Sequence, residues 1–179
     1  KAQMRIETQG VSAHGAEPNL GRNAVYEMAE IISRVERLHE ALQARPASSG
    51  TLALSNISCS CASLNAVPNT CSVSLDRRLD YEETEETVIQ EMEALTRGKQ
   101  AGWVYDEICM RSWTGHEIRY KPLHLAWRIP DGHPLVNAAR QAYSEAFDHH
   151  PPVLSYWNFS TNAVASVSRH IPTIGFGQC

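Results

Sequence analysis

His14 is the residue in this sequence whose type and setting first suggest chemistry. It lies in the stretch GVSAHGAEPNLGRNAV, residues 10–25, which joins a strand-like run to a helix-like run. Gly10, Gly15 and Pro18 make this stretch a tight polar loop, and nothing in its local pattern requires an imidazole. A neutral imidazole can donate a hydrogen bond without adding a full charge. From spacing alone, the simpler interpretation is that His14 holds the strand-to-helix turn through a side-chain hydrogen bond.

The cysteines are the next reactive side chains, and their spacing does not define a site. They are odd in number, and no two form a C-x-x-C pair: Cys59, Cys61, Cys71, Cys109 and Cys179. Two of them are two positions apart in a strand-like run, so they share one face of that strand. We expect small buried hydrophobic side chains in a reducing compartment, rather than a disulfide or a zinc-thiolate site.

Three other histidines, His133, His149 and His150, do not have a recognisable metal-ligand spacing. His149 and His150 precede two prolines in what reads as a solvated loop, and His133 adjoins a helix start. A zinc site needs several convergent ligands. We therefore predict no catalytic metal in this chain.

Composition limits the kind of protein that could carry these residues. The chain has 179 residues, 42% of them hydrophobic and 20% charged, which indicates a globular protein with a core. A formal net charge of -4 argues against nucleic acid as a partner. No apolar run approaches the roughly 20 residues of a membrane span, and we expect a cytoplasmic protein without membrane contact. Because it opens with Lys1 in what looks like the middle of a strand, we expect a piece of something longer.

Hydrophobic periodicity predicts the elements around His14. Residues 2–9 alternate between apolar and polar side chains, which is typical of a half-buried strand. Apolar residues from 25 to 42 recur at helical spacing, with Asn19 as the expected N-cap. The runs 51–62 and 71–79 predict two strands that pair as neighbours.

Further helices and strands are predicted up to residue 118. Asp80 and Glu83 resemble the start of a capping box for a helix that reaches about Gly98, and residues 103–111 predict a fourth strand. The order β-α-β-β-α-β predicts an α+β, ferredoxin-like domain over residues 1–118: a four-stranded antiparallel sheet with two helices on one face.

Residues 119–179 have a different sequence pattern. We predict a helix from Pro134, an extended run at 153–159, a helical run at 160–170 and a short buried strand at 171–177. These elements suggest an incomplete portion of an α/β domain.

Three stretches give the sequence a family resemblance: GVSAHGAEPNLGRNAV, LNAVPNTCSVSLDRRL and FSTNAVASVSRHIPTIGFG. Together they resemble the lid, or dimerisation, domain of the M20 metallopeptidases and amidohydrolases, followed by part of the C-terminal catalytic segment. Within that family, these stretches are most similar in sequence to hydrolases linked with selenium metabolism. The resemblance implies a homodimer formed through the lid domain and two divalent metal ions, usually zinc, in a separate catalytic domain.

The resemblance also implies roles for lid residues. His14 matches the family histidine that crosses the dimer and hydrogen-bonds the substrate carbonyl oxygen as it becomes an oxyanion, a contact worth roughly 3 to 4 kcal/mol. Asn65 matches a lid asparagine that reaches the same partner site; alternatively, it is a turn residue with a left-handed backbone. Arg78 matches the arginine that holds a substrate carboxylate; alternatively, it pairs with Asp76 within the chain.

Ser160 and Thr161 match a loop beside the metal site where hydroxyls and backbone N–H groups bind the substrate; the alternative is plain N-capping of a helix. This loop departs from the family's usual Gly-Thr-Asp, and Gly177-Gln178-Cys179 replaces the usual Gly-Pro-Gly. The family's metal ligands have no counterpart here.

We therefore expect a fragment of an enzyme that hydrolyses an amide or peptide bond by metal-activated water, inactive alone. Its substrate would be a small peptide or an N-acyl amino acid. The alternatives are a non-catalytic ferredoxin-like dimerisation or interaction module, and a small-ligand sensor.

Overall fold

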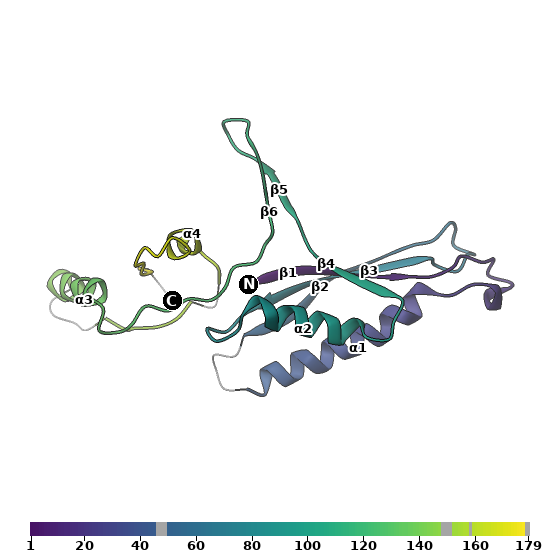
Figure 1. Cartoon of the computed structure of the whole chain (residues 1–179), viewed down its shortest axis with the longest axis horizontal. Helices are drawn as coiled ribbons and strands as arrows, with labels where there is room; N and C mark the ends of the chain where they lie inside the picture. Colours follow the sequence, from purple (N-terminus) through teal and green to yellow (C-terminus); the bar gives the residue numbers. More distant parts are fainter. Residues whose placement is uncertain (46–49, 148–151, 158, 178–179) are drawn as a thin grey trace.

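The central unit of the protein is a four-stranded antiparallel sheet with two helices packed on one face (Figure 1). The structure is a computed structural model that describes residues 1–45, 50–147, 152–157 and 159–177. The strand order is β2-β3-β1-β4, which confirms the predicted ferredoxin-like α+β fold. Its elements are β1 (Ala2–Gln9), α1 (Ala24–Gln43), β2 (Thr51–Ser60), β3 (Thr70–Arg78), α2 (Glu85–Thr96) and β4 (Ala101–Tyr105).

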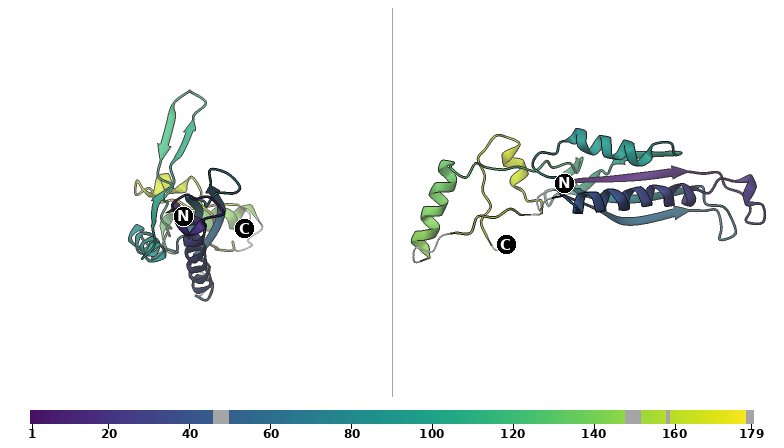
Figure 2. Two further views of the ribbon diagram at one scale, coloured as in Figure 1. Left: turned by 90° about the vertical axis from the view of Figure 1, so that its right-hand side faces the viewer. Right: turned by 90° about the horizontal axis from the view of Figure 1, so that it is seen from below.

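Alternation along the two central strands builds the core. On β1 every second residue from Ala2 to Thr8 is buried, and β3 repeats the pattern from Cys71. The apolar side chains of α1 and α2 pack on this face. The right-hand view of Figure 2 shows both helices on the same side of the sheet. Burying each large apolar side chain contributes about 1.5 to 3 kcal/mol. On the opposite face, the polar side chains of β1 and β3 are exposed or half-buried.

The N-cap of helix α1 lies four residues later than the predicted cap. Asn23, not Asn19, is the N-cap, and its Oδ1 accepts a hydrogen bond from the Val25 N–H at 2.9 Å. Asn19 instead lies in a short 3-10 helix, Pro18–Leu20. The prediction was wrong because the loop continues for one more turn before the helix starts.

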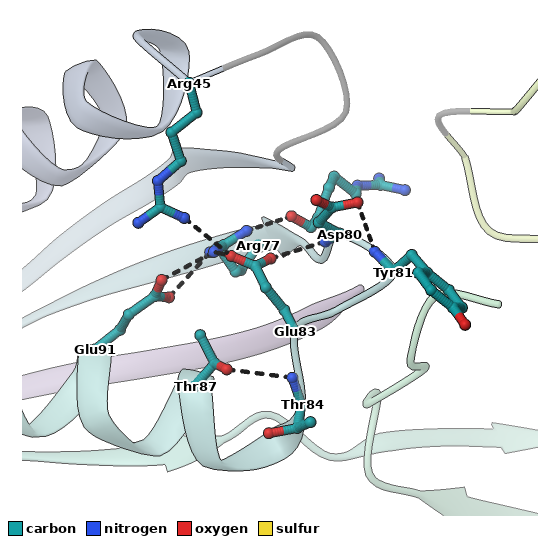
Figure 3. A network of polar contacts seen from close by, with 9 residues as sticks. Arg45, Arg77, Asp80, Tyr81, Glu83, Thr84, Thr87 and Glu91 are labelled. Atoms are coloured by element: carbon teal, nitrogen blue, oxygen red, sulfur yellow. Dashed lines mark hydrogen bonds and ion pairs between the residues drawn. The ribbon is translucent and has the colours of Figure 1, made fainter.

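Helix α2 also begins beyond the predicted capping box. The Asp80 N–H does donate to Glu83 Oε2 at 2.8 Å, but this contact closes a turn. The capping box that starts α2 is formed by Thr84 and Thr87 (Figure 3).

A charged side chain occupies one core position of β3. Arg77 is fully buried, and its Nε and Nη2 donate to the two oxygens of Glu91, both at 2.9 Å (Figure 3). Nη2 also donates to Glu83 Oε1 at 2.5 Å. Burial alone would lower the pKa of Arg77, but hydrogen bonds to Glu91 and Glu83 raise it above its ordinary value. This network joins the end of β3 to α2 and to the turn that precedes it.

The predicted fourth strand, residues 103–111, divides into two. Strand β4 ends at Tyr105, and β5 (Ile108–Arg111) pairs with β6 (Glu117–Tyr120) in a separate hairpin. This hairpin projects away from the sheet (Figures 1 and 2). Residue 118 lies within β6, and a domain division at that point stays a prediction.

The C-terminal portion carries two helices, α3 (Pro134–Ala146) and α4 (Ala163–Val167). His133 is the N-cap of α3, and its Nδ1 accepts from the Leu135 N–H at 3.1 Å. The predicted strand at 171–177 is wrong: these residues form no strand, and most of them are exposed. His149 and His150 lie outside the described residues. Among the described helices, none has the length and apolar character needed to cross a membrane.

Candidate functional site

His14 and Asn65 meet at one end of the sheet, although they are 51 residues apart in sequence. The loop before α1 and the loop between β2 and β3 lie side by side there. The Gly15 N–H donates to the Asn65 carbonyl at 2.6 Å, and the Val67 N–H donates to the Ala13 carbonyl at 2.8 Å. These backbone bonds form an isolated antiparallel bridge and fix both side chains on one short platform.

Two glycines permit this close backbone approach. A Cβ atom at Gly15 would lie 2.7 Å from the Asn65 carbonyl oxygen, and one at Gly10 would lie 2.2 Å from the Arg22 carbonyl oxygen. Real Cβ atoms do not approach oxygens so closely, so a side chain at either position would push the strands of the loop apart. Gly10 and Gly15 are therefore needed for the close packing of the backbone in this loop.

The contacts of His14 define its tautomer. Nδ1 accepts a hydrogen bond from the Ala16 N–H at 3.1 Å, so the proton of the neutral ring is on Nε2. This bond confirms the expected turn-holding contact. Nε2 lies 3.3 Å from Asn65 Nδ2, and the Ser63 hydroxyl donates to Asn65 Oδ1 at 2.5 Å. The alternative that Asn65 has a left-handed backbone is wrong, since His170 is the one non-glycine residue with positive φ in the described chain.

This arrangement places two N–H donors next to each other. With its proton on Nε2, the His14 ring has a donor nitrogen 3.3 Å from the Asn65 side-chain amide nitrogen. Two donors at this separation can be satisfied together by one oxygen acceptor placed between them, such as a carbonyl oxygen. Both side chains are exposed in this chain, so water solvates them here. Such a pair is strongest when a second surface excludes that water.

Arg78 is not part of this platform. It lies at the opposite end of β3 from Thr70, which is eight residues or about 26 Å away along the strand. Its Nε donates to Asp76 Oδ1 at 2.7 Å, so the predicted alternative of an intrachain pair is confirmed.

Ser160 and Thr161 also lie far from His14. Thr161 Oγ1 accepts from the Ala163 N–H at 3.2 Å just before α4. The N-cap of that helix is Asn162, so neither Ser160 nor Thr161 is the predicted N-cap. Ser160 is exposed. In Figure 1 the segment that carries them is at the opposite end of the molecule from the His14 loop.

Metal-ligating side chains do not converge in the described parts of the chain. No group of three or more His, Cys, Asp or Glu residues there could hold a metal ion. The prediction of buried cysteines is partly wrong: Cys71 is buried, but Cys59, Cys61 and Cys109 are exposed. Cys179 is outside the described residues.

Sequence reasoning missed two contributors to these sites. Ser63, which orients the Asn65 amide, gave no signal beyond its nearness in sequence. Arg77 was not among the predicted site residues. The signal that could have found it is the alternation of β3, which puts Arg77 on the buried face.

The sheet topology is consistent with a peptidase dimerisation domain. The family model for the M20 peptidase dimerisation domain matches residues 1–104. The chain therefore belongs to the M20 peptidase dimerisation domain family.

The chain is also similar to a protein of Escherichia coli and to solved structures. The chain is 37% identical to the uncharacterized protein YgeY of Escherichia coli K12 over 184 aligned positions; the match covers 99% of this chain and 45% of YgeY. The chain thus spans less than half the length of that relative. Two solved structures share its fold: aminopeptidase PepT from Bacillus cereus and a tripeptidase from Staphylococcus aureus.

The PepT match has a TM-score of 0.66 at 18% identity and covers 96% of this chain and 41% of PepT. The tripeptidase match has a TM-score of 0.64 at 16% identity and covers 96% of this chain and 42% of that protein. At these identities the matches show the fold alone.

Proposed function

We propose that this chain is the lid and an adjoining segment of a dimeric, metal-dependent peptidase or amidohydrolase. In this proposal His14 and Asn65 of one subunit enter the active site of the second subunit and bind the substrate carbonyl oxygen. The bond that is hydrolysed is an amide or peptide bond in a small, carboxylate-bearing substrate, such as a peptide or an N-acyl amino acid.

The observation that carries the proposal is the pair of adjacent donors at the exposed end of the sheet. His14 Nε2 and Asn65 Nδ2 are 3.3 Å apart and belong to two loops joined by backbone hydrogen bonds. A preorganised pair of donors stabilises the negative charge that develops on a carbonyl oxygen during hydrolysis. Because both donors are solvated in a single chain, they need a second surface to close over the substrate. A partner subunit would supply that surface.

The metal ions lie outside the described residues in this proposal. The described side chains do not fit a two-metal site, so no step of the metal-assisted reaction is assigned to them. When bound elsewhere in the enzyme, zinc or another divalent ion would supply the activated water. The chain alone should be inactive. Adding zinc to the purified chain should give no hydrolysis of dipeptides or N-acyl amino acids, and chelator-sensitive turnover would contradict this.

Subunit mixing tests the transfer of His14 between subunits. In an enzyme that joins these residues to a metal-binding domain, His14→Ala and a metal-ligand variant should each be inactive as homodimers. A mixed dimer would contain one site with an intact metal centre and the partner's intact His14. Random mixing should then restore about a quarter of the wild-type activity.

The mixing experiment also separates the proposal from its alternatives. Wild-type activity in the His14→Ala homodimer would favour a non-catalytic dimerisation module. An inactive homodimer that mixing does not rescue would place His14 in its own subunit's site. If the enzyme were a stable monomer, His14 could not act in the active site of a second subunit.

A further inference from the structure

Cys59 and Cys71 form a cross-strand pair that the proposed hydrolase chemistry does not use. Strand register places them directly opposite each other, Cys59 on β2 and Cys71 on β3. Directly opposite residues of antiparallel strands share a face of the sheet, with Cα atoms about 4.5 to 5.5 Å apart. A disulfide requires Cα atoms about 4.4 to 6.8 Å apart, a range that includes the separation typical of such opposite residues.

The two thiols have different surroundings. Cys59 is exposed on the edge strand, whereas Cys71 is 1% exposed on the core side of β3. Burial raises the pKa of Cys71, and the neighbouring Cys59 raises it further. An oxidant therefore reaches Cys59 first, and Cys71 is placed to react with whatever forms there.

We propose that Cys59 and Cys71 are an oxidation site that closes to an intrachain disulfide in the presence of a hydroperoxide. Cys59 sulfur attacks the peroxide, an S–O bond forms and the O–O bond breaks, which gives a sulfenic acid and an alcohol or water. The Cys71 sulfur then attacks the Cys59 sulfur. The S–S bond forms, the S–OH bond breaks, and the departing hydroxide leaves as water with the Cys71 proton.

The position of the pair gives the disulfide a structural consequence. β2 ends at Ser60, one residue past Cys59, and its chain continues into the loop that carries Asn65. On the other strand, the Cys71 carbonyl accepts a hydrogen bond from the Thr8 hydroxyl at 3.2 Å, which ties it to β1. The disulfide would therefore join the outer strand β2 to the central strand β3, next to the loop that carries Asn65. Amide hydrogen exchange in residues 59–67 should slow on oxidation.

Peptide mapping by mass spectrometry after hydrogen peroxide treatment tests the site. The expected product is a non-reduced peptide pair containing Cys59 and Cys71, two hydrogens lighter than the separate peptides and separated again by reductant. Because the pKa of Cys71 is raised, closure should become faster as pH increases through the alkaline range.

Matched variants identify the partner thiol. Cys61→Ser, which changes an exposed neighbour of Cys59, should leave the Cys59–Cys71 link intact. Cys71→Ala should abolish the link and leave Cys59 to oxidise further to sulfinic acid. Cys59→Ser alters only an exposed side chain, so the fold should persist while the link is lost.

Three outcomes would overturn the proposal. They are a link between Cys59 and Cys61, a disulfide between two copies of the chain, and stepwise over-oxidation of Cys59 in the wild-type protein with Cys71 left as a thiol.

Discussion

Arg77 binds Glu91 through two parallel hydrogen bonds, Nε to Oε2 and Nη2 to Oε1, each 2.9 Å long. This bidentate contact connects a central strand to the helix that covers it, on the largely apolar face of the sheet (Figure 3). The guanidinium fork fits a carboxylate in a way that an ammonium does not. The buried charge of Arg77 therefore helps to hold α2 on the sheet.

Replacing Arg77 should strongly destabilise the domain. Arg77→Ala leaves the Glu83 and Glu91 carboxylates without their buried partner, which should cost about 3 to 5 kcal/mol of unfolding free energy. Arg78→Ala is the matched control, because that side chain is partly exposed and its pair with Asp76 should contribute less than about 1 kcal/mol. Urea denaturation followed by circular dichroism measures both. Equal losses for the two variants would contradict the assignment.

Gly15→Ala should separate the two loops of the platform. The added Cβ would lie 2.7 Å from the Asn65 carbonyl oxygen, so the Gly15–Asn65 backbone bond should lengthen or break. Gly102→Ala is the control, since its Cβ would meet nothing within 4 Å. NMR shifts of the Asn65 side-chain amide should change in the first variant and stay unchanged in the second. An unchanged Asn65 signal in Gly15→Ala would show that the platform does not depend on this contact.

The neutral His14 ring should be the Nε2–H tautomer. The Ala16 N–H occupies Nδ1 as a donor, so the ring proton must be on the other nitrogen. Long-range proton–nitrogen correlation spectra at alkaline pH distinguish the two tautomers by their nitrogen shifts. An Nδ1–H tautomer would remove His14 as a donor toward the space beside Asn65.

In the enzyme that we propose, His14→Ala should lower kcat by about 100- to 1,000-fold, the effect of removing one oxyanion donor. Asn65→Ala should have a smaller effect on the same parameter, because the remaining imidazole still donates. The double variant should lose less than the product of the two single losses, since both donors serve one oxygen. Steady-state kinetics with dimer content checked by light scattering gives the comparison. Independent, fully multiplicative effects would argue for two separate binding points.

Tyr105 provides a pH-dependent test of the core near β4. Burial, with a further contribution from Glu85, raises the pKa of Tyr105 from 10 to about 12 in the folded protein. Folding therefore favours the protonated phenol, and this contribution to stability is present below about pH 10 and lost as pH rises toward 12. Ultraviolet titration of the wild type minus Tyr105→Phe should show a phenol that ionises near 12. A midpoint near 10 would mean that the ring is solvated.

The sheet was predictable from sequence because its two central strands alternate. Residues 2–9 were predicted as a strand and form one over the same residues, since the apolar side of β1 must face the helices. Residues 103–111 were not resolved into two strands, because both halves have similar apolar content. The break falls at Asp106, whose N–H bonds back to Gln3 while the chain turns away into the hairpin.

The platform could be predicted only in part. The family resemblance pointed to His14 and Asn65, but spacing could not bring together two residues from separate loops. Their contact depends on the backbone conformation of both loops and on glycines that permit a close approach. Helix starts were missed for a related reason: Asn19, Asn23 and Asp80 all suit a cap, and tertiary packing decides which of them starts a helix.

β2 has a further consequence for how copies of this chain associate. Its outer edge pairs with no other strand of the described residues, and the register with β3 shifts between Leu54 and Asn56, which leaves Ser55 as an extra residue. Such an irregularity bends an outer strand and interrupts the straight row of unpaired backbone groups that fibril growth requires. The domain can thus keep an exposed edge for a specific contact and still resist polymerising into open-ended stacks.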